Sequence, residues 1–412
     1  MLSSLAATPL VLEEGRHRRG SRGLRRVNLA LFAAGLTTFM SLYSTQALLP
    51  TLSGAFRVSP TAASLLVSLA TGTLALAVIP VSSLSERFGR TRVMLVSSAV
   101  AAPLGLLMPL CPSFATLAAV RALQGIALAG VPAVAMAYLA DEVHPEALGG
   151  AMGRYIAGNS VGGLAGRLLP GLVTDVAGWR WALGATAFVS LLLTVVFCAL
   201  LPRSRFFSPS TGRRGLLRHL ADPGMRRLYV VGLVLMSTFV TVYNYLGYRL
   251  TAAPFGLPES LAALVFVMYV AGTFSSPAAG SLADRIGRRP VLLGACLLTG
   301  AGLLLTLPDS LPAVAAGLMV MTCGFFAAHT VASGWVGGRA STGRAQASGL
   351  YLFAYYLGAS AGGSAGGLAY EHGHWAGTVA YGLVLLVVAL VAAVGISAGG
   401  RRSRAQEADT TA

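Results

Sequence analysis

Lysine is absent from this chain of 412 residues, and charged residues of every kind are scarce. Charged residues make up 11% of the sequence and hydrophobic residues 55%, whereas about 25% of the residues of a soluble domain are charged. The four cysteines have neither a CxxC nor a metal-ligand spacing, so we expect no disulfide framework, no bound metal and no cofactor. This composition excludes a soluble globular protein.

Long apolar runs take the place of the missing charge. Each approaches the roughly 20 residues that a helix needs to span a bilayer. The runs lie at about 28–50, 61–82, 93–111, 114–140, 147–170, 179–201, 228–250, 258–280, 291–307, 311–336, 345–369 and 375–398. We therefore predict an all-α integral membrane protein with twelve transmembrane helices. The net charge of +16 does not indicate nucleic-acid binding, because the arginines lie between the apolar runs.

The placement of arginine predicts the orientation in the membrane. Of the 30 arginines, 24 lie in the N-terminal tail, in loops after even-numbered runs and in the C-terminal RRSR. The positive-inside rule then places both termini in the cytoplasm. No cleavage site follows the N-terminal arginines cleanly, so the first run is interpreted as a transmembrane helix and not as a signal peptide. The predicted parts are a disordered basic tail (1–27), a six-helix half (28–202), a cytoplasmic linker (203–227), a second six-helix half (228–398) and a cytoplasmic tail (399–412).

The two halves repeat each other at an offset of about 200 residues. TTFMSLYST at 37–45 matches STFVTVYNY at 237–245, SLSERFGRTRV at 83–93 matches SLADRIGRRPV at 281–291, and GNSVGGLAG at 158–166 matches GASAGGSAG at 358–366. Parallel repeats of six helices predict a pseudo-two-fold axis along the membrane normal, with a binding cavity where the halves face each other.

The most specific motif is the short loop after the second run, which recurs after the eighth. A central glycine permits a tight turn, and the neighbouring acid and arginines can form ion pairs that hold one conformation. We expect a cytoplasmic latch from Glu86, Arg87, Gly89, Arg90, Arg92, Asp284, Arg285, Gly287, Arg288 and Arg289. The alternative is that the arginines only anchor the topology.

The predicted partners of this latch lie at the ends of the fourth and tenth runs. We expect Asp141 and Glu142 to lie near the arginines of the first copy. At the corresponding place in the second half, we expect Arg339 to lie near Asp284. The alternative is that these are exposed charges.

Both copies of the loop resemble the G-x-L-x-D-R-x-G-R-R motif of the major facilitator superfamily. The first copy departs from that pattern, since Ser82 replaces Gly, Glu86 replaces Asp and Thr91 interrupts the basic run. The resemblance covers residues 28–398 and implies a secondary transporter that works by alternating access. YSTQALLP at 43–50 resembles the first helix of the YnfM-type, or acriflavin-sensitivity, branch of this family.

Two further motifs resemble proton-linked members of the family. Arg121, Gln124 and Gly125 match an R-x-x-Q-G motif of the fourth helix and imply a coupling or gating role, whereas Arg121 could instead snorkel to the outer interface. The glycines at 158, 162 and 166 permit close helix packing. They resemble the fifth-helix motif of drug:proton antiporters, except that Gly166-Arg167 stands where Gly-Pro is expected.

The repeated hydroxyl-rich stretch predicts a polar face on the first and seventh helices. A lipid-facing polar seam has no rationale, so we expect it to line a cavity that binds an organic substrate. Hydrogen bonding between packed helices or to the helix's own backbone is the alternative. The predicted substrate-binding residues are Thr37, Ser41, Tyr43, Ser44, Gln46, Arg154, Asn159, Ser237, Thr241, Tyr243, Asn244, Tyr245 and Tyr248.

None of the 14 acidic residues lies deep in an apolar run, so if protons drive transport we expect their carrier to be another kind of residue. His329, near the middle of the tenth run, is the titratable candidate, and a structural histidine is the alternative. The resemblance to the superfamily implies a monomeric transporter of the bacterial inner membrane, which exports small organic molecules by proton antiport. The alternatives are uptake by symport or facilitated diffusion, and a non-transporting ligand sensor. We do not expect an enzyme, since no nucleophile–base pair or phosphate loop lies in the runs.

Overall fold

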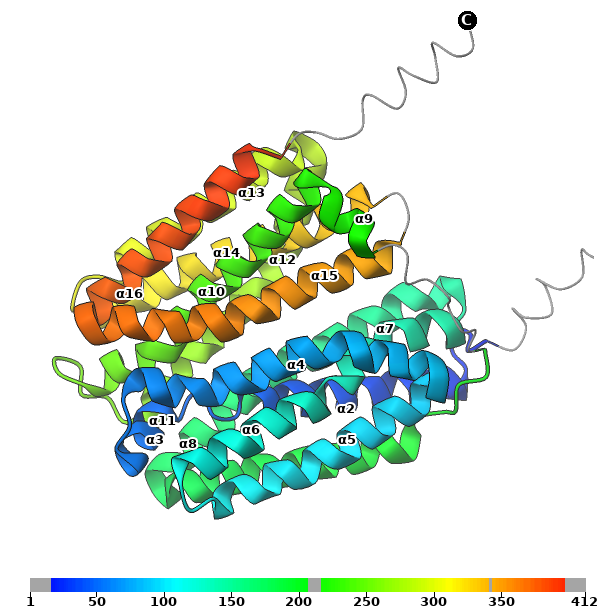
Figure 1. Ribbon diagram of the computed structural model, residues 1–412, viewed down its shortest axis with the longest axis horizontal. Coiled ribbons are helices and arrows are strands. Elements are labelled where there is room, and N and C mark those ends of the chain that lie inside the picture. Colours follow the sequence, from blue (N-terminus) through cyan, green and yellow to red (C-terminus); the bar gives the residue numbers. More distant parts are fainter. Residues whose placement is uncertain (1–15, 207–215, 341–342, 397–412) are drawn as a thin grey trace, which may run out of the picture. The chain divides into compact units, whose positions relative to one another are not determined.

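The computed structural model describes residues 16–206, 216–340 and 343–396, and every named element within them is a helix (Figure 1). Most of the predicted N-terminal tail, the whole C-terminal tail and linker residues 207–215 lie outside the described residues. The elements are α2 (Arg22–Tyr43), α3 (Leu49–Phe56), α4 (Pro60–Phe88), α5 (Arg90–Leu107), η1 (Met108–Leu110), α6 (Phe114–Leu128), α7 (Gly130–Glu142), α8 (Pro145–Leu200), α9 (Leu216–Ala221), α10 (Pro223–Thr251), α11 (Glu259–Ala263), η3 (Leu264–Val270), α12 (Ala271–Ile286), α13 (Arg288–Leu305), α14 (Leu311–Arg339), α15 (Arg344–Leu357), η4 (Gly358–Gly362) and α16 (Gly363–Val394). The predicted all-α membrane fold is confirmed.

The twelve predicted spans are recovered from fewer continuous helices. In the described ranges, nine helices are long and apolar enough to cross a membrane. Two of them are double, because the backbone leaves the helical region at Gly178 in α8 (φ 78°) and at His374 in α16 (φ 48°). The remaining span is α2, which begins among arginines and has 22 residues.

Helix starts follow local sequence signals. Ser59 accepts a hydrogen bond from the Ala62 amide at the start of α4, with Pro60 as the first helical residue. Ser113 and Thr116 form a capping box at the start of α6. These side chains satisfy backbone N–H groups that would otherwise lack an acceptor, which fixes where the helices begin.

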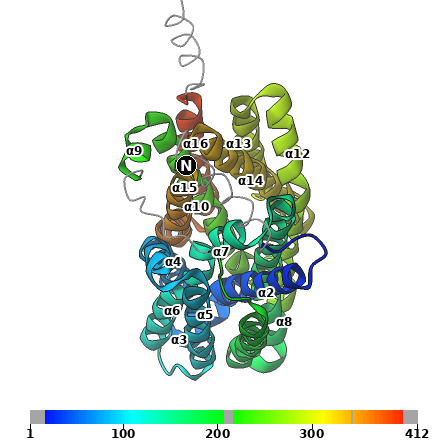
Figure 2. The ribbon, with the colours of Figure 1, turned by 90° about the vertical axis from the view of Figure 1, so that its right-hand side faces the viewer.

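The chain forms two compact units. Unit 1 contains the chain up to residue 211 together with residues 257–266, and unit 2 contains residues 212–256 and those from 267 onward. In unit 1, α4, α5 and α6 lie side by side (Figures 1 and 2). The short segment 257–266 follows α10 of the second half in sequence but packs with unit 1, which the sequence division did not anticipate.

Glycine allows the closest helix packing in unit 1. A Cβ atom at Gly158 would lie 2.4 Å from the Phe32 carbonyl oxygen, and one at Gly162 would lie 2.3 Å from the Leu36 carbonyl oxygen. The backbones of α2 and α8 therefore touch, as small residues at this spacing permit. In unit 2, Gly358 lies against the Leu233 carbonyl of α10 in the same way.

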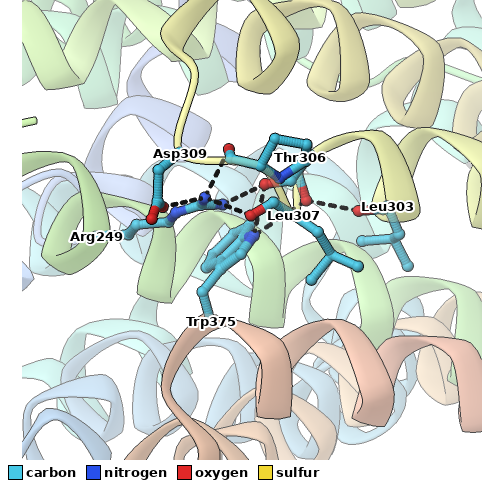
Figure 3. A network of polar contacts seen from close by, with 7 residues as sticks. Arg249, Leu303, Thr306, Leu307, Asp309 and Trp375 are labelled. Atoms are coloured by element: carbon cyan, nitrogen blue, oxygen red, sulfur yellow. Dashed lines mark hydrogen bonds and ion pairs between the residues drawn. The ribbon is translucent and has the colours of Figure 1, made fainter. Parts of the chain in front are cut away.

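A polar network holds one end of unit 2 together (Figure 3). Arg249, in the last turn of α10, donates to the carbonyls of Thr306 and Leu307 and forms an ion pair with Asp309 at 3.1 Å. The indole of Trp375 donates to the Thr306 hydroxyl at 3.0 Å. The network satisfies carbonyl groups at the C-terminal end of α13, which cannot bond within that helix.

Candidate functional site

The loop between α4 and α5 forms the predicted turn and one of the predicted ion pairs. Gly89 alone separates the two helices, at a φ of 91° that favours glycine. The Nε atom of Arg90 lies 2.5 Å from Oδ2 of Asp141, in the last turn of α7. Glu86 is half-buried, whereas Arg87 and Arg92 are exposed. The loop and the end of α7 are thus joined by a partly buried charge pair.

Glu142, in contrast, does not bind the loop arginines as predicted. Its Oε1 atom accepts hydrogen bonds from the Ser204 hydroxyl at 2.8 Å and from the backbone amides of Arg205 and Phe206. Glu142 is 1% exposed, so these donors replace the water that the carboxylate loses. Its role in the structure is to fix the start of the linker.

The second copy of the loop repeats the turn but not the ion pair. Gly287 has a φ of 96° between α12 and α13, and the exposed Asp284 forms no ion pair with any described residue. Arg339 instead binds Asp222 through Nε (2.7 Å) and Nη2 (3.0 Å). The predicted pairing of Arg339 with Asp284 is therefore wrong. Asp222 also caps α10 by accepting from the Gly224 amide.

This pairing also affects the titration of Asp222. The bidentate hydrogen bonds from Arg339 hold the pKa of the Asp222 carboxyl below its usual range, because they stabilise the ionised form. The remaining arginines of the second copy are exposed: Arg285, Arg288 and Arg289. Arg289 donates through Nη2 to the Val394 carbonyl of α16.

The Arg90–Asp141 pair can be measured by a double-mutant cycle. Because the two side chains are 12% and 21% exposed, we expect a coupling free energy of about 1 kcal/mol between Arg90→Ala and Asp141→Ala. The measurement is thermal unfolding of the purified variants in one detergent. The matched cycle of Arg87→Ala with Asp141→Ala should give a coupling near zero, and equal couplings in the two cycles would contradict the structure.

Arg121 does not reach the outer interface, because it is completely buried in unit 1. Its Nε donates to the Leu66 carbonyl at 2.8 Å, and Nη1 donates to the Ser41 carbonyl at 2.9 Å and to Oε1 of Gln124 at 2.7 Å. Its Nη2 donates to the Leu42 carbonyl. Two of these carbonyls belong to the last turn of α2, where the regular hydrogen bonding of the helix ends. The R-x-x-Q part of the motif thus caps a helix end in the interior of unit 1.

Gly125 completes this motif by close packing. A Cβ atom at this position would lie 2.2 Å from the Ala70 carbonyl oxygen. Only glycine therefore lets α6 approach α4 at this level.

The polar face of the first helix is used for packing within unit 1. The hydroxyl of Thr37 donates to the Ser190 carbonyl at 2.9 Å, and that of Ser41 donates to the Ser190 hydroxyl at 3.2 Å. Ser44 donates back to the Ser41 carbonyl. All three are less than 9% exposed. The structure shows hydrogen bonding between packed helices at these positions, and their predicted role in substrate binding stays a prediction.

The hydroxyls of α10 likewise form hydrogen bonds to a helix that packs against it. Ser237 donates to the Gly358 carbonyl at 3.1 Å, and Thr241 donates to the Gly362 carbonyl at 3.2 Å. Both acceptors lie in η4, a π-helical turn whose backbone carbonyls are less regularly paired than those of an α-helix. The repeated seam is therefore a repeated packing contact.

Aromatic residues of α10 build the interior of unit 2. The Tyr243 hydroxyl lies 2.8 Å from the Thr322 hydroxyl. Tyr245 stacks on Tyr370, with ring centroids 5.2 Å apart, and Tyr248 lies 6.2 Å from Tyr245. Asn244 is 1% exposed in the same region.

His329 of α14 lies in the aromatic interior of unit 2. Its Nδ1 atom is 3.0 Å from the Tyr351 hydroxyl, and its ring lies 4.7 Å from that of Tyr355 and parallel to that of Phe325. The pair of His329 and Tyr351 can exchange donor and acceptor roles with the histidine tautomer. It is thus chemically able to hold or pass a proton.

The two α8 residues expected in the cavity lie in different surroundings. Arg154 is exposed and lines a cavity of about 240 Å³ together with Arg19, Arg25 and Glu146. Asn159 is half-buried and packs toward α2, where a Cβ atom at Gly35 would lie 2.3 Å from its Oδ1 atom.

Arg167 is the buried residue of unit 1 that the sequence predictions missed. It is 3% exposed, and its Nε donates to Oε1 of Gln46 at 2.6 Å. Its guanidinium carbon lies 3.8 Å from the centre of the Tyr43 ring. The signal was present as an arginine within an apolar run, at the position where the antiporter pattern has proline.

The apolar spans and the buried charges together define the class of membrane protein to which the chain belongs. Twelve apolar spans in two compact units, with buried charges inside and charged turns at the ends, are the construction of a multi-pass membrane transporter. The model of the Major Facilitator Superfamily matches residues 31–252 and 228–410. The chain belongs to this superfamily.

Individual relatives agree with this assignment. The chain is 42% identical to the inner membrane transport protein YnfM of Escherichia coli over 379 residues, covering 91% of each chain. It is 40% identical to the uncharacterized MFS-type transporter YybF of Bacillus subtilis over 378 residues, covering 90% of this chain and 94% of that one. Among solved structures, an inward-facing bacterial homologue of the lysosomal transporter Spinster matches with a TM-score of 0.75 at 17% identity, covering 91% and 96% of the two chains.

Proposed function

We propose that this transporter exports small organic molecules by alternating access, driven by proton antiport. It would work as a monomer in the bacterial inner membrane, with both termini in the cytoplasm. The observation that carries the proton coupling is the contact between His329 and Tyr351 inside unit 2. The R-x-x-Q-G and glycine motifs, which resemble those of proton-linked transporters, support the same function.

His329 suits the role of proton carrier for two reasons. Imidazole is the unperturbed side chain that changes its charge between pH 5 and 8. The described acidic residues lie at or near helix ends, so no carboxylate competes for this role in the middle of a span. Tyr351 can accept from or donate to the ring, which allows the histidine to change its protonation state without losing its neighbour.

The ion pairs at the helix ends support alternating access. Arg90 joins the α4–α5 loop to α7 in unit 1, and Arg339 joins α14 to the linker in unit 2. A conformational cycle needs contacts of this kind, which are strong enough to favour one state and weak enough to break. We propose that the Arg90–Asp141 pair is part of the cytoplasmic latch.

The test is transport by the purified protein in proteoliposomes, with and without a pH gradient. The compounds would be a panel of labelled aromatic anions, cations and neutral molecules. We expect at least one compound to be moved against its concentration gradient only while the pH gradient is present. Movement that ignores the pH gradient would overturn proton coupling, and binding without movement would indicate the ligand-sensor alternative.

His329→Gln should separate coupling from movement. Glutamine keeps a hydrogen bond to Tyr351 but cannot take up a proton, so we expect gradient-driven accumulation to fall about tenfold or more while downhill exchange continues. The control is His372→Gln, which alters an exposed histidine of α16. Full gradient-driven transport by His329→Gln would remove this residue from the mechanism.

A further inference from the structure

Arg167 brings a positive charge into the interior of unit 1, away from the loops and tails that contain most of the arginines. It lies in α8 between Gly163 and Gly171, well inside the span, and is 3% exposed. Its Nε donates to Oε1 of Gln46 at 2.6 Å, and its Nη1 donates to the Gly163 carbonyl. A charge at this depth costs free energy, so it usually marks a functional site.

Arg121, the other buried arginine among the described residues of unit 1, has a structural explanation that does not extend to Arg167. Besides the Gln124 side chain of its own helix, Arg121 donates to three backbone carbonyls of α2 and α4, two of which lie at a helix end. Those three backbone carbonyls are held in place by the helices to which they belong. Arg167 donates to one backbone carbonyl, that of Gly163 in its own helix, and to the side chain of Gln46, 121 positions away in the chain. The Gln46 amide can turn away and leave its place to another acceptor. Arg167 is therefore the arginine whose geometry suits a ligand that comes and goes.

The charge balance of unit 1 indicates the sign of that ligand. Its described acidic residues are Glu86, Asp141, Glu142, Glu146, Asp175 and Glu259. Each lies at a helix end or within a few residues of the Gly178 break in α8. The middle of the unit thus contains guanidinium groups and no carboxylate from the described chain. An anion that enters this region gains electrostatic free energy, whereas a cation loses it.

Aromatic rings around the guanidinium indicate the shape of the ligand. The Tyr43 ring lies 3.8 Å from the guanidinium carbon, and the Phe266 ring lies 5.4 Å from it. Flat aromatic groups of a ligand pack well against such rings. Tyr43 and Gln46 both belong to the YSTQALLP stretch, so this stretch contributes an aromatic surface and an amide beside the same arginine.

A short segment covers this arginine. Phe266, which is 3% exposed, belongs to residues 257–266, which pack on unit 1. The segment is held there by the Ser260 amide, which donates to Asp175 at 2.9 Å, and by the Thr51 hydroxyl, which donates to Glu259. Access to Arg167 from this side requires the segment to move, as a gate would.

We propose that Arg167, Gln46 and Tyr43 recognise the transported substrate, and that this substrate is a small aromatic organic anion with a carboxylate or sulfonate group. This inference rests on the proposed transport function and names its substrate class. The guanidinium fork binds two oxygens of the anion. The amide of Gln46 turns to donate a further hydrogen bond, and the Tyr43 ring packs on the aromatic part.

The experiment measures equilibrium binding to the full-length protein in nanodiscs. The probes are benzenesulfonate, which stays ionised at every working pH, and benzyltrimethylammonium, a cation of similar size. We expect the wild-type protein to bind benzenesulfonate at least tenfold more tightly than the cation. Arg167→Gln should weaken benzenesulfonate binding about tenfold or more, the loss expected for a charge-assisted bidentate contact.

Two further variants keep the result interpretable. Arg180→Gln removes a charge from an exposed site on the other span of α8, beyond the break at Gly178, and should leave binding unchanged. Arg167→Lys keeps the charge without the fork, and we expect an intermediate affinity together with preserved anion preference. If Arg167→Gln does not fold, the Arg167→Lys variant and the wild-type preference for the anion still decide the matter.

The inference would be overturned by a wild-type protein that retains no benzenesulfonate, by equal binding of the cation, or by full binding in Arg167→Gln. These outcomes differ from failure of the proposed transport. Anion transport that ignores the pH gradient would overturn proton coupling and leave the inference standing. Gradient-driven transport of the cation alone would overturn the inference of an anionic substrate and leave proton coupling standing.

Discussion

Arg121→Gln is expected to lower the free energy of unfolding by about 3–5 kcal/mol and to remove transport. The guanidinium donates to the carbonyls of Ser41 and Leu42, which lie at the end of α2 in the membrane interior. The Ser41 carbonyl keeps the Ser44 hydroxyl as a donor, whereas the Leu42 carbonyl loses its arginine donor, and a buried carbonyl without a donor costs about 1–3 kcal/mol. The cavity left by so large a side chain adds to this cost.

The measurement is thermal unfolding in detergent, together with the yield of monodisperse protein. Arg121→Lys should fall between the wild type and Arg121→Gln, because an ammonium group reaches fewer of the four acceptors. The control is Arg180→Gln, which alters an exposed arginine of α8. An Arg121→Gln protein that melts with the wild type would show that these hydrogen bonds do not hold α2 in place.

Gly162→Leu is expected to prevent unit 1 from forming. A Cβ atom at this position would lie 2.3 Å from the Leu36 carbonyl oxygen and 2.7 Å from the Leu36 Cα atom. Both contacts are with backbone, which cannot rotate aside as a side chain can. The helices α2 and α8 would have to separate, with a cost of about 3 kcal/mol or more and the loss of the Thr37 and Ser41 hydrogen bonds to Ser190.

The same helix supplies the matched control. Gly153 is exposed, and a Cβ atom there would meet nothing within 4 Å. Gly153→Leu should therefore express and melt like the wild type, while Gly162→Leu should be recovered in low yield or as aggregate. Gly162→Ala should be intermediate. Equal yields of the two leucine variants would refute the close contact between α2 and α8.

The two copies of the latch loop have the same turn but form different ion pairs. The turns at Gly89 and Gly287 are equivalent because both helix pairs need the same reversal. The ion pairs differ because Arg339 finds Asp222, which caps the helix that follows the linker. The linker has no counterpart in the first half, so the sequence repeat could not predict this partner.

The polar stretch TTFMSLYST had two interpretations that its sequence could not separate. Hydroxyls on one helix face satisfy either a water-filled cavity or the carbonyls of a neighbouring helix, and both give the same pattern. Ser190 and Thr194 of α8 supply the partners on the neighbouring helix, because Thr37 donates to the Ser190 carbonyl and its hydroxyl lies 3.2 Å from that of Thr194. These partners lie more than 150 positions away in the chain, beyond the reach of any local pattern.

Most of the fold was determined by the sequence alone. Runs of about 20 apolar residues leave no alternative to spanning helices, since backbone groups in a bilayer must be bonded within the helix. The repeats, the glycine turns and the resemblance to the superfamily could also be recognised in the sequence, because each depends on residues that are neighbours in the chain.

The partners of the buried charges were decided only by tertiary structure. The sequence identified Arg121 but assigned it to the interface or to coupling, and it gave Arg167 no role. Whether a buried guanidinium meets helix carbonyls, as at Arg121, or a flexible amide and an aromatic ring, as at Arg167, depends on how distant helices are rotated and spaced. That rotation is set by the sum of many packing contacts along α2, α4, α6 and α8, so no single stretch of sequence contains it.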